Sequence, residues 1–279
     1  MGQWNYHCNK ALTVALATHN TKFETTKNTS RRLDKVITAI SNTDTKFANL
    51  DGRISKLWDE ILSSSHLVKA INNGDFTKNL YAIYMLETYH YTSHNAANQA
   101  LVGIKNHDNS VYSKFCFKHA YDETGHEKMA LHDLLSIGID KDKFIIPKPL
   151  PETETLIAYL YWISCNGNPF RRLGYSYWAE SSYKYINPLI HKIKDTLKLD
   201  SSQMTFFIAH SEIDEKHAEE VESIILRTCK DSCDWEDLIT VAETSLRLTG
   251  AMLEAVYREH QNFLKGKSER YGFINKCFI

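Results

Sequence analysis

The chain of 279 residues is long enough to bury a substantial hydrophobic core, and its formal net charge of −1 gives no electrostatic reason to expect a nucleic acid or an anionic membrane as partner. Its six cysteines show neither a Cys-x-x-Cys pair nor the spacing of a disulfide framework, which favours reduced thiols in a cytoplasmic protein. No segment approaches the roughly 20 apolar residues of a membrane-spanning helix, and the N-terminus lacks the pattern of a signal peptide.

Residues 1–50 differ in composition from the rest of the chain. They are rich in Asn, Thr and Lys, with a short apolar run at 11–17 and the pattern of a small helix at 31–40. We predict a polar N-terminal extension of mixed order here, followed by one helical domain over residues 51–279.

Apolar residues recur at helical spacing through the predicted domain, whereas strand signals are nearly absent. The proline-rich stretch 147–151 is the clearest break, and we interpret it as a crossover inside one bundle. The sequence therefore predicts an all-α, single-domain bundle of about seven core helices. These helices are expected over residues 54–71, 76–106, 111–137, 152–164, 170–197, 201–229 and 234–264.

The helix predicted at 201–229 carries His210, Asp214 and His217 at positions i, i+4 and i+7, so the three side chains share one face. Phe207 and Val221 continue this face as an apolar stripe. An ionised carboxylate in such a core is unfavourable without a cationic partner. The pattern therefore predicts bound metal, and a structural polar cluster is the alternative.

The helix predicted at 111–137 supplies a Glu-x-x-His element, Glu123 with His126, which is typical of metal sites in helical bundles. Glu123 faces an apolar stripe and His126 lies close to it, whereas His132 lies opposite if the helix is unbroken. Gly125 can loosen this turn, and in that case His132 becomes the alternative ligand.

Two further glutamates fall on aromatic helix faces. Glu180 follows Tyr177 and is flanked by Tyr183, which indicates a buried carboxylate among aromatic side chains. The alternative, favoured by residue type alone, is an exposed position. Glu87 shares a face with Tyr91, and this patch is either part of the surroundings of the site or ordinary core.

Histidines and carboxylates together form a donor set that suits iron or manganese, and the absence of paired cysteines argues against a thiolate zinc site. Such a set can hold two ions about 3.5 to 4 Å apart.

The combination of Glu123, Glu180 and His210-x3-Asp214-x2-His217 resembles the haem-oxygenase-like diiron oxidases and oxygenases over residues 80–230. The resemblance implies a haem-oxygenase-like fold, related also to the thiaminase-like proteins, and a centre of two Fe²⁺ ions that uses O2 as co-substrate. It assigns catalytic roles to Glu123, Glu180 and Asp214. The implied metal ligands are Glu123, His126, Glu180, His210, Asp214 and His217, with Glu87 as an additional ligand and His132 as the alternative to His126.

The expected function is O2-dependent oxidation of a small metabolite. We favour an amine or amino acid over a fatty acid, because the sequence shows no pattern that indicates a long aliphatic channel. Arg172, Tyr177 and Lys184 are the predicted substrate-binding residues, since a cationic side chain can bind a carboxylate. The alternatives are a non-catalytic, partner-binding helical protein with a degenerate metal site and a metal-free thiaminase-like enzyme. Expected partners are a small-molecule substrate, an external electron donor and a second copy of the chain.

Overall fold

The structure, a computed structural model, describes the backbone of residues 26–278 and the side chains of residues 43–210 and 216–278. The chain divides between Phe47 and Ala48 into two compact units. The apolar run predicted at 11–17 lies outside the described residues. The short helix predicted at 31–40 is part of a much longer one that begins at Thr26.

The described residues form helices, and the one backbone bridge between separate segments of residues 26–278 is the antiparallel pair Ile139 and Phe278. This confirms the predicted all-α class. None of these helices combines the length and the apolar character that crossing a membrane requires. The helices are α2 Thr26–Ser64, α3 His66–Asn73, α4 Lys78–Thr92, α5 Asn95–Lys105, α6 Ser110–Asp122, α7 His126–Ser136, α8 Pro151–Cys165, α9 Leu173–Glu180, α10 Tyr183–Leu197, α11 Thr205–Thr228 and α12 Ser232–Leu264, with 3₁₀ turns at η1 Pro169–Arg172, η2 Ser201–Gln203 and η3 Gly272–Lys276.

Several helices that the sequence predicts as continuous are broken in the structure. The predicted helix 54–71 is split at Ser65, whose side chain caps α3 by accepting from the Val68 N–H. The predicted helix 111–137 is interrupted by Gly125, which has a φ of 97°. The predicted helices 76–106 and 170–197 are likewise each divided, into α4 and α5 and into η1, α9 and α10.

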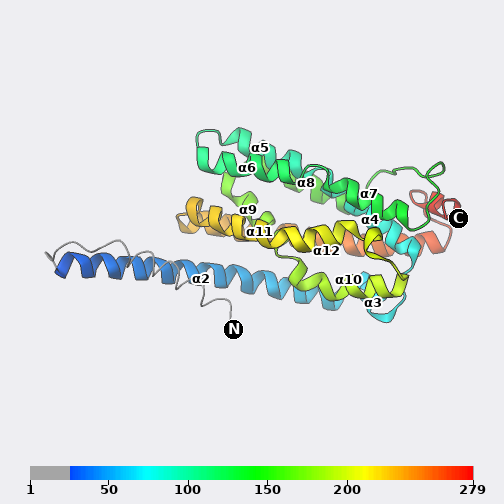
Figure 1. The fold of residues 1–279 in the computed structure, drawn as a ribbon, viewed down its shortest axis with the longest axis horizontal. Helices are drawn as coiled ribbons and strands as arrows, with labels where there is room; N and C mark the ends of the chain where they lie inside the picture. The colour runs from blue at the N-terminus through cyan, green and yellow to red at the C-terminus, as the bar shows by residue number, and fades with distance from the viewer. Residues whose placement is uncertain (1–25, 279) are drawn as a thin grey trace. The chain divides into compact units, whose positions relative to one another are not determined.

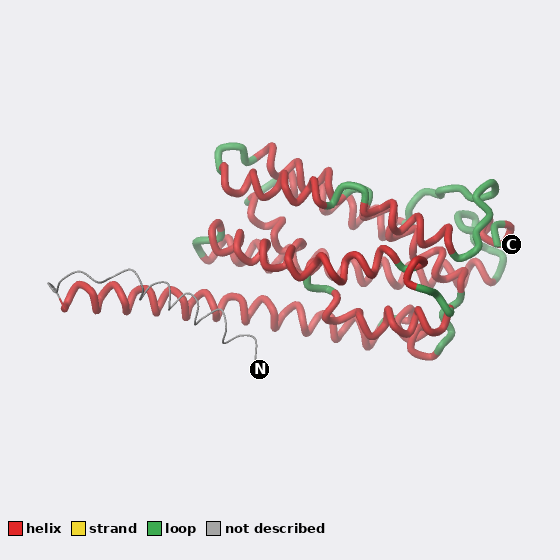
Figure 2. The backbone as a smooth tube through the Cα atoms, in the orientation of Figure 1, coloured by secondary structure: helices red, strands yellow, loops and turns green. Residues whose placement is uncertain are grey.

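Within the larger unit, α12 is the central helix and packs against α3, α4, α8 and α9. Figures 1 and 2 show α5 and α6 along one side of this unit and α3 and α10 along the other, with α11 and α12 between them. Gly174 allows the close approach of α9 to α12, because a Cβ atom there would lie 2.0 Å from the Leu238 carbonyl oxygen. The site described next lies where α6, α7, α9 and α11 meet.

Candidate metal centre

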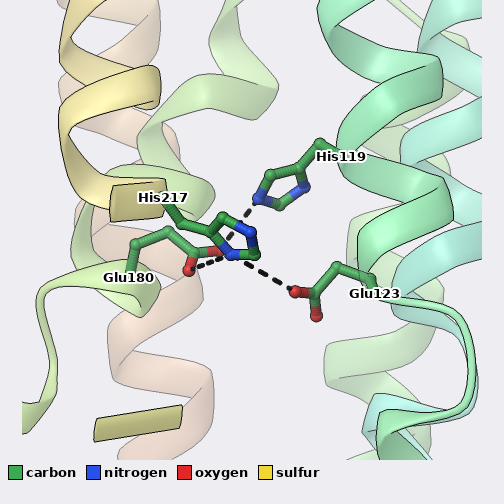
Figure 3. A group of neighbouring side chains, drawn as sticks. All are labelled: His119, Glu123, Glu180 and His217. Carbon is green, nitrogen blue, oxygen red and sulfur yellow. Dashed lines mark hydrogen bonds and ion pairs between the residues drawn. The ribbon is translucent and has the colours of Figure 1, made fainter. Parts of the chain in front are cut away.

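Two overlapping groups of carboxylates and imidazoles converge in the interior of the larger unit. One group consists of His119, Glu123, Glu180 and His217, and the other of Glu123, His126 and His210. Within each group the ligand atoms lie within 4.8 Å of one another. Glu123 belongs to both groups, and Figure 3 shows how the first group closes across the space between α6 and the pair α9 and α11.

The ends of helices place these side chains. His119 lies in the last turn of α6, and Glu123 is the residue that caps its C-terminus. Gly125 then takes a left-handed conformation, so that His126 starts α7 beside Glu123. Glu180 is the last residue of α9.

The two remaining histidines belong to α11, whose first turn is held by a side chain of α7. Asp133 is fully buried and accepts hydrogen bonds from the N–H groups of Thr205 and Phe206, each at 2.8 Å. This capping satisfies donors that a helix N-terminus leaves unpaired. It fixes α11 against α7, and thereby His210 and His217 against His126.

The first group is held together by contacts to Glu180. Its carboxylate lies 3.1 Å from His119 Nε2 and 3.4 Å from His217 Nδ1. Burial alone would raise the pKa of Glu180, but the contacts with His119 and His217 lower that pKa well below its usual range. The same contact with Glu180 raises the pKa of His217.

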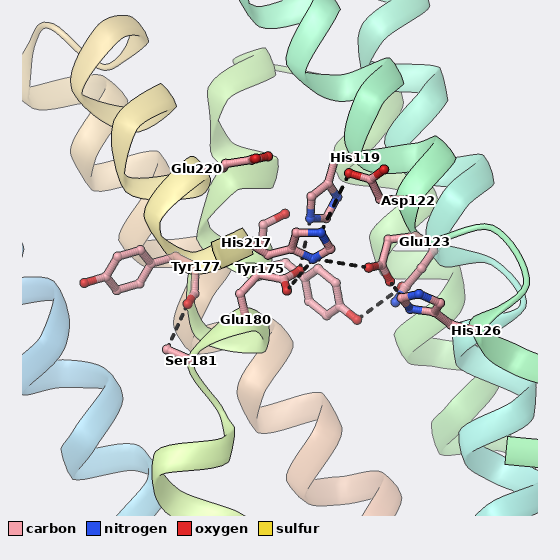
Figure 4. A network of polar contacts seen from close by, with 12 residues as sticks. His119, Asp122, Glu123, His126, Tyr175, Tyr177, Glu180, Ser181, His217 and Glu220 are labelled. Atoms are coloured by element: carbon pink, nitrogen blue, oxygen red, sulfur yellow. Dashed lines mark hydrogen bonds and ion pairs between the residues drawn. The ribbon is translucent and has the colours of Figure 1, made fainter. Parts of the chain in front are cut away.

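His217 presents its two nitrogens to different partners. Nδ1 faces Glu180 and Glu123, whereas Nε2 lies 3.7 Å from Asp122 Oδ2 on the other side of the ring (Figure 4). A histidine that binds a metal through one nitrogen commonly directs the other to a carboxylate. Asp122 is therefore positioned to orient His217.

The second group places His126 beside Glu123 and His210. His126 Nδ1 lies 3.5 Å from Glu123 Oε2, and its ring centroid lies 4.7 Å from that of His210. His210 Nδ1 donates to the Phe206 carbonyl at 2.6 Å, so the neutral ring keeps a lone pair on Nε2. Burial lowers the pKa of His210, which favours this neutral, metal-binding form.

The donor set fits metal ions. The Nδ1 atoms of His126 and His217 are buried and face carboxylates at 3.4 to 3.8 Å without forming a hydrogen bond, which is costly in a protein interior. Two ligand atoms each about 2.1 Å from one ion are roughly 3 to 3.5 Å apart, close to the distances seen around Glu180. Imidazole and carboxylate ligands in this combination suit iron or manganese.

Five of the predicted ligands are brought together, namely Glu123, His126, Glu180, His210 and His217. The backbone of Asp214 belongs to α11, but its side chain lies outside the described residues. The sequence analysis missed His119. Its signal was available, because His119 stands four residues before Glu123 and so shares its helix face.

Two other predicted ligands belong to neither group. The helix break at Gly125 occurs, yet His132 points away from the centre and its Nε2 lies 3.1 Å from the Ser202 carbonyl. Glu87 is fully buried, accepts from the Leu150 N–H at 3.0 and 3.1 Å and from the Tyr271 hydroxyl, and has a pKa raised mainly by burial. Glu87 therefore links α4 to the proline-rich crossover through Leu150 and to the C-terminal end of the chain through Tyr271.

A cavity of about 150 Å³ adjoins the centre, with Glu123, Glu180 and His210 in its wall. The three predicted substrate-binding residues do not line it. Arg172 donates to Asn98 and Ser176, the hydroxyl of Tyr177 donates to Asp51 at 2.9 Å, and the half-exposed Lys184 lies 3.9 Å from Asp51.

Comparison with known proteins assigns the chain to a family. A family model described as an iron-containing redox enzyme matches residues 82–250, a range that includes every residue of both groups. The chain belongs to this family. The match confirms the family resemblance that the sequence indicated. Among curated proteins, none matches the chain.

Solved structures share the fold of this family member. A domain of unknown function with a haem-oxygenase-like fold from Shewanella denitrificans is 53% identical, with a TM-score of 0.78 over 81% of this chain and 97% of that chain. TenA homologues from P. horikoshii and Pyrococcus furiosus are 14% and 15% identical, with TM-scores of 0.60 and 0.61 over 76% of this chain and 98% and 100% of theirs. The predicted haem-oxygenase-like fold is thereby confirmed.

Proposed function

We propose that the chain is a non-haem diiron oxidase or oxygenase that uses O2 to oxidise a small organic molecule. The observation that carries this proposal is the pair of His and Glu groups sharing Glu123 in the wall of a cavity. Membership of an iron-containing redox enzyme family supports iron as the metal, and manganese is the alternative from the donor chemistry.

The residues have distinct roles in this proposal. His119, Glu180 and His217 would hold one ion, His126 and His210 the other, and Glu123 would stand between them. Asp214 stays a proposed ligand on the sequence pattern alone. Two ferrous ions, when bound, supply the electrons and open coordination positions that O2 activation requires.

The protein contributes orientation and exclusion of water. Asp122 orients His217, and the Phe206 carbonyl orients His210. His119, Glu123 and His217 are all at least nine-tenths buried, and aromatic side chains such as Phe206 and Tyr175 complete the wall of the cavity. The predicted external electron donor, homodimer and cytoplasmic location stay predictions.

A metal-free thiaminase-like reaction through a cysteine is the alternative. Cys116 is buried, burial raises its pKa to about 11, and it does not line the cavity. No other cysteine among the described residues lines it. The structure therefore offers no thiolate nucleophile at the cavity within the part of the chain that it describes.

An anaerobic titration with ferrous iron, followed by exposure to O2, tests the proposal. We expect two iron ions per chain and then O2 consumption with a transient change in visible absorption. His210→Ala should abolish the change, whereas His132→Ala, a histidine outside both groups, should leave it intact. Failure to bind iron stoichiometrically in the unaltered protein would contradict the proposal.

A further inference from the structure

Three oxidisable rings form a row that starts in the wall of the cavity. The ring of Trp178 lies edge-on to that of Trp58, with centroids 6.0 Å apart, and Trp58 stacks on Tyr185, with centroids 5.3 Å apart. The three side chains come from α9, α2 and α10, so the row exists only in the folded chain. These separations are those of aromatic rings in direct contact. An electron can therefore pass along the row from ring to ring.

The inner end of the row borders the metal centre. Trp178 lines the cavity together with Glu123, Glu180 and His210. It stands on α9 two residues before Glu180, which is the last residue of that helix. A short backbone segment therefore joins the first ring of the row to a proposed iron ligand.

The outer end of the row reaches the surface. Trp178 and Trp58 are buried, whereas Tyr185 is partly exposed. The half-exposed Lys184 lies beside it, with its Nζ 5.0 Å from the centroid of the Tyr185 ring. A dissolved reductant thus has access to Tyr185 and not to the two indoles.

The polar atoms of the rings decide how each would carry charge. Trp178 Nε1 donates to Ser245 Oγ at 2.8 Å, and Trp58 Nε1 is buried without a hydrogen-bond partner. Neither N–H is bonded to a base, so each indole keeps its proton when it loses an electron. Phenylalanine at position 58 would keep a ring between the other two and avoid the cost of an unpaired N–H. Packing alone therefore does not explain Trp58.

Tyr175 also contacts Trp178, with ring centroids 5.4 Å apart, but it is poorly suited to give up an electron. Its hydroxyl donates to the amide oxygen of Asn95 at 3.2 Å, and an amide is too weak a base to take the proton. The Arg172 guanidinium lies 4.5 Å from the centroid of the Tyr175 ring. Positive charge left on this buried ring would be repelled by that cation. Electrons are therefore expected to reach Trp178 from Trp58.

We propose that Tyr185, Trp58 and Trp178 form a relay that carries single electrons from a dissolved reductant to the metal centre. This inference rests on the proposed function and gives a route from the expected external electron donor. Trp178 passes one electron to the oxidised iron and regains one from Trp58, which regains one from Tyr185. Tyr185 releases its hydroxyl proton to water and becomes a neutral radical. A reductant of the ascorbate or thiol class then returns one electron and one proton to its oxygen.

Flash photo-oxidation of the metal-free protein tests conduction by the rings. A laser pulse ejects an electron from tryptophan, hexaamminecobalt(III) takes up that electron, and time-resolved absorption follows the radicals. We expect the tyrosyl signal to grow as the indole radical cation decays, because a tyrosine that also loses its proton is oxidised more easily than an indole that keeps it. A row that serves packing alone would show no such transfer.

Two tyrosine variants localise the transfer. Tyr185→Phe keeps the stacked ring and removes the oxidisable hydroxyl, so it should lose most of the growth of the tyrosyl signal. Tyr257→Phe is the matched control, since Tyr257 is also partly exposed and stacked, on His66 with centroids 5.6 Å apart. This variant should retain the growth. Equal growth in Tyr185→Phe and in the unaltered protein, or no growth in either, would overturn the relay.

The iron-loaded protein gives a second readout. When the anaerobic ferrous protein is exposed to O2 with no reductant added, Tyr185 should remain as a radical that freeze-quench electron paramagnetic resonance detects. Tyr185→Phe should lose this signal while still binding two iron ions, and Trp58→Phe should diminish it. Addition of ascorbate should remove the signal from the unaltered protein. A radical signal that persists unchanged in Tyr185→Phe would count against the relay.

The outcome is separable from that of the iron titration, because the flash experiment requires no iron. If the rings conduct while iron fails to bind, the proposed diiron function falls and conduction by the rings stands. If iron binds and reacts with O2 while the rings do not conduct, the function stands and the relay is wrong.

Discussion

At the scale of single residues, Glu123 is the point where the two halves of the centre join. Its Oε2 lies 3.5 Å from His126 Nδ1 and its Oε1 lies 3.8 Å from His217 Nδ1, so one carboxylate faces both groups. His119, by contrast, belongs only to the group around Glu180. The loss of these two side chains should therefore have different consequences.

Glu123→Ala is expected to lose both iron ions, and His119→Ala only one, because only Glu123 is common to the two groups. Iron per chain after anaerobic gel filtration measures this difference. His132→Ala serves as the control and should retain two ions. Retention of two ions by the Glu123 variant would show that the carboxylate is not shared.

Asp122→Asn tests the residue that faces the outer nitrogen of His217. Loss of such an outer partner typically costs 10- to 100-fold in metal affinity, and we expect about this reduction in a competition with a chelator. Glu220→Gln is the matched control, since Glu220 shares the Lys118 ion pair with Asp122. Equal affinities of the two variants would argue against an orienting role for Asp122.

At the scale of elements, interruptions of helices build the centre. Glu123 stands where α6 ends, His126 where α7 begins, and Glu180 where α9 ends. The spacing of apolar residues does not reveal these breaks, because the segments before and after each break contribute to the same core. The sequence therefore predicts one continuous helix at each of these places. The break after Glu123 depends on the left-handed conformation of Gly125, which a residue with a Cβ adopts only at a cost.

Gly125→Ala should destabilise the protein by about 1 to 2 kcal/mol, through backbone strain and not through a clash, because no atom lies within 4 Å of the added Cβ. Denaturant unfolding measures the effect. The same replacement at Gly52, an exposed helical position of α2 with equal space, should be stabilising by up to about 1 kcal/mol. A Gly125 variant as stable as the parent protein would contradict the proposed role of the strained turn.

At the scale of the whole molecule, the centre, the cavity and the family match all fall within the unit that begins at Ala48. The division lies inside α2. The first unit therefore contributes no side chain to the groups that the structure describes at the centre. The domain boundary predicted after residue 50 stays a prediction.

Removal of residues 1–47 should leave a cooperatively folded protein that binds two iron ions, because the residues of both groups and of the cavity wall are retained. Thermal unfolding followed by circular dichroism and an iron titration provide the measurements. A truncated chain that folds but does not bind iron would show that the first unit supports the site.

The sequence by itself determined the helical class and the positions of five of the converging side chains, because the spacing of apolar and metal-binding residues along a helix follows from backbone geometry. Only the tertiary structure decided that His119 joins the centre, that Glu87 and His132 do not, and that Arg172 is bound to Asn98 and Ser176. Periodicity tells which residues share a face. Periodicity does not tell which face packs against another helix or how much space remains between two helices. These depend on helix breaks and on packing between segments that are distant in the sequence.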